Sequence, residues 1–105
     1  MNQNLKNAIG LINNMISKPG MYLINRVEDL HYFIHGYTLA SSDEAIEEFF
    51  VKFRDFINNK FDDNGTSSWY RIIRFNSSTD IHSISLFKQY FEEFLKTYYQ
   101  QYSII

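Results

Sequence analysis

The sequence predicts an all-α fold, a single compact bundle of four main helices and one short helix. Apolar residues recur at intervals of three and four along most of the chain, which is the spacing of one helix face. Only one Pro and four Gly interrupt the 105 residues. One segment, residues 69–75, could also form a strand, but no second strand is evident with which it could pair. Because so short a chain has little room for a second core, we expect residues 1–105 to form one helical domain.

The first predicted helix covers residues 4–17 and ends at the turn formed by Pro19 and Gly20. Its apolar positions are Leu5, Ala8, Ile9, Ile12, Met15 and Ile16. Lys18, near its end, suits the negative end of the helix dipole. We expect residues 21–24 to form a short extended connection.

The second predicted helix begins after Asn25, whose side chain can cap it. Glu28 and Asp29 fall in its first turn, where negative charge is favourable. Its apolar positions are Leu30, Phe33, Ile34 and Tyr37. Gly36 weakens a helix interior, so we expect it to let another element approach closely.

Ser41 and Glu44 have the form of a capping box, which predicts a third helix running to about Lys60. Its apolar positions are Ile46, Phe49, Phe50, Phe53, Phe56 and Ile57. The residues that follow, 62–68, are rich in Asp, Asn, Gly and Ser and predict a polar loop.

Residues 69–75 are assigned to a short helix, because an isolated strand would not be stable. Its expected buried positions are Trp69, Ile72, Ile73 and, as a further candidate, Phe75. After a loop at residues 76–79, a long final helix is predicted from Asp80 to about Gln101. Its apolar positions are Ile81, Ile84, Phe87, Phe91, Phe94, Leu95 and Tyr98.

Composition excludes several classes of function. The chain has no Cys, which rules out disulfides, thiolate catalysis and zinc-thiolate sites. A net charge of −2 disfavours direct binding of nucleic acid. No apolar stretch approaches the roughly 20 residues that span a membrane, and the N-terminus lacks the features of a signal peptide. We therefore expect a cytoplasmic protein without membrane contact. No phosphate loop or nucleophile elbow is present, so we expect neither an enzyme nor a cofactor.

A group of acidic residues and two C-terminal tyrosines are the candidate partner-binding residues. Closely spaced carboxylates on the third helix are either an ordinary solvated face or a docking surface for a basic partner. Exposed Tyr side chains are well suited to a protein interface, although a frayed helix end would explain these two tyrosines equally well. The candidate residues are Asp43, Glu44, Glu47, Glu48, Asp55, Asp62, Asp63, Tyr99 and Tyr102.

Two other clusters have a weaker claim to function. Glu28, His31 and His35 have the spacing of one helix face, as three metal ligands would, but no fourth ligand is identifiable. A packed or solvated histidine pair is favoured over a metal-dependent enzyme. Arg71 and Arg74 are too few for a phosphate track, so they are read as solvated residues flanking a buried Trp.

The order of certain residues resembles that of small bacterial immunity proteins, which are encoded with polymorphic toxins, including those of contact-dependent growth inhibition systems. The residues are a Pro-Gly-Met-Tyr-Leu segment (residues 19–23), Gly36 with Tyr37, and Trp69. The resemblance covers most of the chain. These anchors are expected to determine the fold, as a turn, a close helix approach and a core Trp, and not to contact a partner.

The resemblance implies a non-enzymatic, cytoplasmic protein that binds its cognate toxin domain as a monomer, one to one, and occludes the toxin's active site. Such toxins are often nucleases, whose substrate surfaces are basic because they bind phosphates. An acidic surface on the inhibitor could occupy such a site. The alternative is a cytosolic adaptor or regulatory module that uses the same acidic and aromatic surface for another partner or for homodimerisation.

Overall fold

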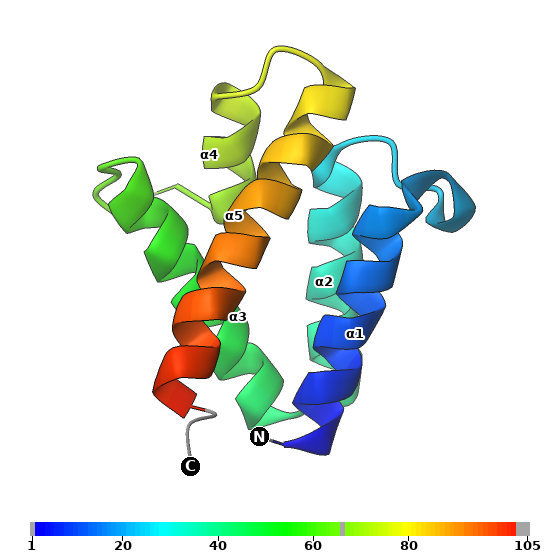
Figure 1. Cartoon of the computed structure of the whole chain (residues 1–105), viewed down its shortest axis with the longest axis vertical. Helices are drawn as coiled ribbons and strands as arrows, with labels where there is room; N and C mark the ends of the chain where they lie inside the picture. The colour runs from blue at the N-terminus through cyan, green and yellow to red at the C-terminus, as the bar shows by residue number, and fades with distance from the viewer. Residues whose placement is uncertain (1, 66, 103–105) are drawn as a thin grey trace.

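The computed structural model describes residues 2–65 and 67–102, without the side chain of residue 102. Over these residues it contains five α-helices, one 3-10 turn and no strand (Figure 1). The elements are α1 (Gln3–Ser17), η1 (Pro19–Tyr22), α2 (Val27–Ser41), α3 (Glu44–Lys60), α4 (Trp69–Phe75) and α5 (Asp80–Tyr102). The predicted all-α class, with four main helices and a short one, is confirmed. None of the helices in the described residues is long and apolar enough to cross a membrane.

The helices pack around one apolar core. Every position predicted for the buried side of α1 is buried. At the centre, the ring of Phe53 on α3 contacts Trp69 of α4 and three rings of α5, with centroid distances of 5.4 to 5.7 Å. The α5 rings are those of Phe87, Phe91 and Phe94. These edge-on contacts between aromatic rings join three helices at one residue.

The short helix α4 packs against both α2 and α3 (Figure 1). It reaches only part of their length, because it has seven residues where α2 has 15 and α3 has 17. On α2, aromatic rings of α4 contact the ring of His31, in the first half of that helix. On α3, they contact the ring of Phe53, past the middle of that helix. The later half of α2 and the first half of α3 are therefore not covered by α4.

The segment after α1 differs from its prediction. Residues 19–22 form a 3-10 turn instead of an extended connection, and the Ile24 N–H donates to the Pro19 carbonyl at 2.9 Å. Leu23 adopts a left-handed conformation with φ of 60°, and its side chain is 81% exposed. The turn closes on its own backbone hydrogen bonds. The turn expected at this segment is confirmed, and the exposed side chains of Met21 and Leu23 do not pack into the core.

The predicted caps were each wrong by one or two residues. Arg26, not Asn25, precedes α2, and the Asn25 N–H instead donates to the Asp29 carboxylate at 2.9 Å. Asp43, not Ser41, caps α3, because α2 continues through Ser41. Gly36 is exposed, and no atom lies within 4 Å of the place where a Cβ would stand, so it permits no close approach of another element.

Two apolar residues predicted to be buried are exposed. Phe75 ends α4 and is 88% exposed, and Ile81 lies in the first turn of α5 and is 78% exposed. Both flank the turn that joins these helices, at an end of the molecule beyond the core (Figure 1). Helical spacing places them on the apolar face, but the packed core does not extend that far.

Candidate protein-binding surface

Asp43 is a structural carboxylate at the beginning of α3. One of its oxygens accepts the Ala45 backbone N–H at 2.9 Å, and the other accepts the side-chain amide of Asn4 at 3.0 Å. The bond from Asn4, followed by the one from Ala45, lowers the pKa of Asp43. This residue was predicted to contact a partner, but in the free protein it caps α3 and ties it to α1.

The next three glutamates project from the first two turns of α3. Glu44, Glu47 and Glu48 are all exposed, and we call them the acidic face. Glu48 pairs with Lys52 at 3.1 Å, whereas Glu44 and Glu47 have no ion-pair or hydrogen-bond partner within the described residues. Carboxylates three and four residues apart repel one another, although the helix N-terminus offsets part of that repulsion.

A groove between α2 and α3 adjoins the acidic face. It consists of two neighbouring hollows of about 200 and 390 Å³, which share His35, Thr38 and Glu47. Its remaining lining residues are His31, Ile34, Leu39, Ser42, Phe50, Val51, Arg54 and Trp69. We call it the α2–α3 groove. Its floor is apolar and its edges are polar, which is the arrangement typical of a protein interface.

His31 closes one end of the groove in a stack of rings. Its ring lies 3.9 Å from that of Tyr70, edge-on to Trp69 at 5.8 Å and 6.0 Å from His35. Burial, and to a lesser degree the neighbouring His35 and Arg71, lowers the pKa of His31. His31 is therefore a neutral ring at neutral pH.

Further along the groove lie a buried hydroxyl without a hydrogen bond to the described residues and two exposed apolar side chains. The Thr38 hydroxyl oxygen is buried and makes no hydrogen bond. Leu39 and Val51, one on each side of the groove, are 67% and 40% exposed. An unpaired buried hydroxyl costs free energy. A ligand that supplied a hydrogen bond there would recover some of it.

The other three predicted carboxylates are paired with a neighbour or distant from the acidic face. Asp55 pairs with its neighbour Arg54 at 3.1 Å. Asp62 and Asp63 follow the far end of α3, and a helix of 17 residues places them roughly 25 Å from Glu44. The structure thus does not bring the predicted acidic residues together on one surface.

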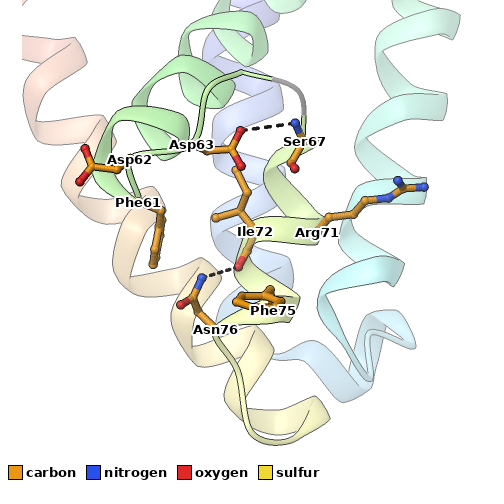
Figure 2. Close-up of a pocket in the computed structure, with 8 residues that line it drawn as sticks. All are labelled: Phe61, Asp62, Asp63, Ser67, Arg71, Ile72, Phe75 and Asn76. Carbon is orange, nitrogen blue, oxygen red and sulfur yellow. Dashed lines mark hydrogen bonds between the residues drawn. The ribbon is translucent and has the colours of Figure 1, made fainter.

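Asp62 and Asp63 instead border a pocket of about 460 Å³ between the loop after α3 and α4 (Figure 2). The Asp63 carboxylate accepts the backbone N–H groups of Gly65 at 2.9 Å and Ser67 at 3.4 Å, which holds the loop. Figure 2 shows Arg71 directed away from the two aspartates. The pocket is larger than either hollow of the groove, but its best-placed carboxylate is committed to loop structure.

Of the two predicted tyrosines, Tyr99 lies away from the acidic face. Tyr99 is 39% exposed and borders a hollow between α1 and α5 that is also lined by Lys88, Glu92 and Lys96. The side chain of Tyr102 lies outside the described part of the chain.

Glu28 is not directed at the histidines. Its carboxylate forms a two-pronged ion pair with Arg74, at 2.6 and 2.9 Å, and Arg74 also bonds Asp80 at 2.9 Å. Within the described residues, no group of three or more His, Asp or Glu could hold a metal ion. Arg74 is thus a bridge between helices and not the solvated residue expected, whereas Trp69 is buried as predicted.

Sequence reasoning did not find the α2–α3 groove. Val51 follows Glu47 by four residues and Glu44 by seven, so the sequence does show that it shares their helix face. The opening itself depends on how little of α2 and α3 is covered by α4, which only the structure shows. No protein family, curated protein or solved structure matches the chain, so the surface is interpreted from its own chemistry.

Proposed function

We propose that this protein is an immunity protein that binds a bacterial toxin domain and neutralises it by occluding its active site. The toxin's active site would be basic, as in a nuclease. The supporting observation is the acidic face, where Glu44 and Glu47 are exposed and have no ion-pair partner in the part of the chain that the structure describes, beside a groove with an apolar floor. The resemblance of the sequence to immunity proteins supplies the biological role.

The mechanism has two stages. The acidic face first attracts the basic partner and speeds encounter, because complementary charge raises association rates. Apolar contacts in the α2–α3 groove then slow dissociation, because buried anchors contribute most of the binding free energy. The bound inhibitor blocks access of phosphate-bearing substrate both sterically and by occupying the positive site.

A cytosolic adaptor is the second candidate. It is favoured by the apolar side chains exposed elsewhere, in η1 and around the α4–α5 turn. These are Met21, Leu23, Phe75 and Ile81, each at least 72% exposed. An adaptor would use such a second surface, which an inhibitor of one toxin does not require.

A growth assay tests the proposal. The probe is the C-terminal domain of a large secreted protein encoded next to this gene, expressed alone and together with this chain. We expect the domain to arrest growth and the intact chain to restore it. The double variant Glu44→Lys, Glu47→Lys should restore growth poorly while keeping the helical circular dichroism of the parent.

The control variant is Asp62→Lys with Glu92→Lys, which makes the same change in net charge at exposed positions away from the acidic face and the groove. It should protect cells as the parent does. Failure of the intact chain to protect against an active toxin domain encoded beside it would refute the immunity role and leave the adaptor. Full protection by the Glu44, Glu47 variant would refute the acidic face as the docking site.

A further inference from the structure

We propose that the α2–α3 groove receives an amphipathic α-helix from the partner, with apolar side chains toward the groove and Lys or Arg toward the acidic face. This inference rests on the proposed function, because it names the part of a basic partner that binds. Such a helix would cover the part of α2 and α3 that α4 leaves uncovered.

The groove continues the site that α4 occupies. The short helix packs between α2 and α3 near His31 and Phe53, and its Trp69 forms part of the groove floor. The smaller hollow of the groove borders α4 at Trp69, and the larger one is lined only by residues 35–47 of α2, α3 and the turn between them. A second helix packed there would cover surface that α4 is too short to reach, by the same fit of side-chain ridges into helix grooves.

Each side of the groove has the spacing that a docking helix requires. On α3, the groove is lined by Glu47, Phe50, Val51 and Arg54, at i, i+3, i+4 and i+7, which is one face over two turns. On α2, the groove is lined by His31, His35, Thr38 and Leu39, at i, i+4, i+7 and i+8. Each face is about two turns long and has the spacing that side chains of a packed partner helix can follow.

Charge identifies which kind of helix fits. Glu44 and Glu47 have no ion-pair partner among the described residues, and the guanidinium group of Arg54, which lines the groove, is bonded to Asp55 at 3.1 and 3.3 Å. His31 is neutral, since its burial lowers its pKa. The available charge is therefore negative and lies along α3, so it selects a helix whose edge on that side carries Lys or Arg.

Two contacts would fix the position of the docked helix. Leu39 lines the larger hollow from α2 and Val51 lines the smaller one from α3, so each can contact an apolar side chain of the docked helix. The buried Thr38 hydroxyl borders both hollows and makes no hydrogen bond to the described residues, so it can bond a polar group of the incoming helix.

The test uses a synthetic amphipathic helical peptide of Leu, Ala and Lys, titrated into isotope-labelled protein and followed by amide chemical shifts. The expected result is saturable shifts confined to the later half of α2 and the first half of α3. Leu39→Ser and Val51→Ser should each weaken binding by about tenfold, the effect of losing one apolar anchor. Both residues are exposed, so these variants should fold.

Three controls make the result decisive. A peptide with Glu in place of Lys, and a peptide of the same composition without an apolar face, should not bind. Phe75→Ser, which removes an exposed ring at the other end of the molecule, should leave binding unchanged. Shifts located around η1 or the α4–α5 turn, or equal binding by the Leu39→Ser variant, would overturn the proposal.

The toxin domain separates this inference from the proposed function. Suppose that the toxin domain binds, that charge reversal of Glu44 and Glu47 abolishes this binding, and that Leu39→Ser and Val51→Ser leave it unchanged. The immunity role then stands, and the proposal of a docked helix is wrong. If the peptide binds in the groove but no neighbouring toxin does, the groove is a helix receptor and the immunity role is wrong.

Discussion

Arg74 joins three helices through one guanidinium group. It bonds Glu28 of α2 and Asp80 of α5 from its own position near the end of α4. The side chains of Arg74 and Glu28 are 31% and 19% exposed, so the pair is only partly screened by water. The bond from Arg74 is the main reason that the pKa of Glu28 lies below its ordinary value.

Replacing Arg74 should therefore destabilise the protein in a pH-dependent way. We expect Arg74→Ala to lower the free energy of unfolding by about 1 kcal/mol at neutral pH, the upper range for a well-formed, partly exposed pair. A carboxylate whose folded-state pKa is lowered contributes stability that is lost as pH falls through that pKa. The difference between parent and variant should shrink toward about pH 3 in urea denaturation, below the ordinary pKa of Glu.

Arg54→Ala is the matched control, since its pair with Asp55 joins neighbours on one helix and is more exposed. It should change the free energy of unfolding by less than about 0.5 kcal/mol. An Arg74→Ala variant as stable as the Arg54→Ala variant would show that the three-helix bridge contributes nothing.

His31 contributes to the pH dependence with the same sign as Glu28, but in a higher pH range. Its pKa is lowered in the folded state, so the unfolded chain binds a proton more readily, and stability falls as the pH drops below the ordinary pKa of about 6.5. His31→Gln removes this titration. Urea denaturation of the variant should show a shallower loss of stability between about pH 7.5 and pH 5.

The comparison must use pH slopes and not absolute stabilities, because the variant also loses the stack on Tyr70. If the slopes of parent and variant are parallel, His31 does not titrate as its burial implies.

At the scale of the element, Asp43 is the clearest case of a residue whose role the sequence left ambiguous. Both Ser41 and Asp43 are good caps, and the structure selects Asp43, whose carboxylate accepts the Ala45 N–H. Ser41 belongs to α2, and its hydroxyl donates to the Thr38 carbonyl at 3.0 Å.

Substituting the two residues should distinguish them. Asp43→Ala should lower the urea midpoint of unfolding and reduce helicity at the start of α3, because it removes the cap and the bond from Asn4. Ser41→Ala, which removes the cap predicted from sequence, should leave the midpoint nearly unchanged. Equal losses from the two substitutions would restore the capping-box interpretation.

The helices themselves could be predicted from the sequence because apolar periodicity reports directly on the buried face. The spacing of Leu5 through Ile16 predicts α1 to within one residue at its start. Periodicity does not show where the core ends, and so Phe75 and Ile81 were predicted to be buried. Nor does it decide between adjacent caps, since that depends on where the preceding helix stops.

At the scale of the whole molecule, the candidate site could be predicted only in part. The acidic residues of α3 were identified, but their separation into two ends of the helix follows from its length, and the role of Asp43 follows from packing against α1. The α2–α3 groove exists because α4 is short, and its lining comes from three helices. No local pattern in the sequence encodes such an opening.

The central claim is that the acidic face captures a basic partner beside this groove. The most direct measurement is the association rate of the neighbouring toxin domain with the parent chain and with the Glu44→Lys, Glu47→Lys variant over a range of salt concentrations. We predict that the parent associates fast at low salt and more slowly as the salt concentration rises. The variant should associate at least about tenfold more slowly at low salt, and its association rate should depend little on salt. The Asp62→Lys, Glu92→Lys control should behave nearly as the parent does. An association rate that the Glu44, Glu47 reversal leaves unchanged would contradict the account.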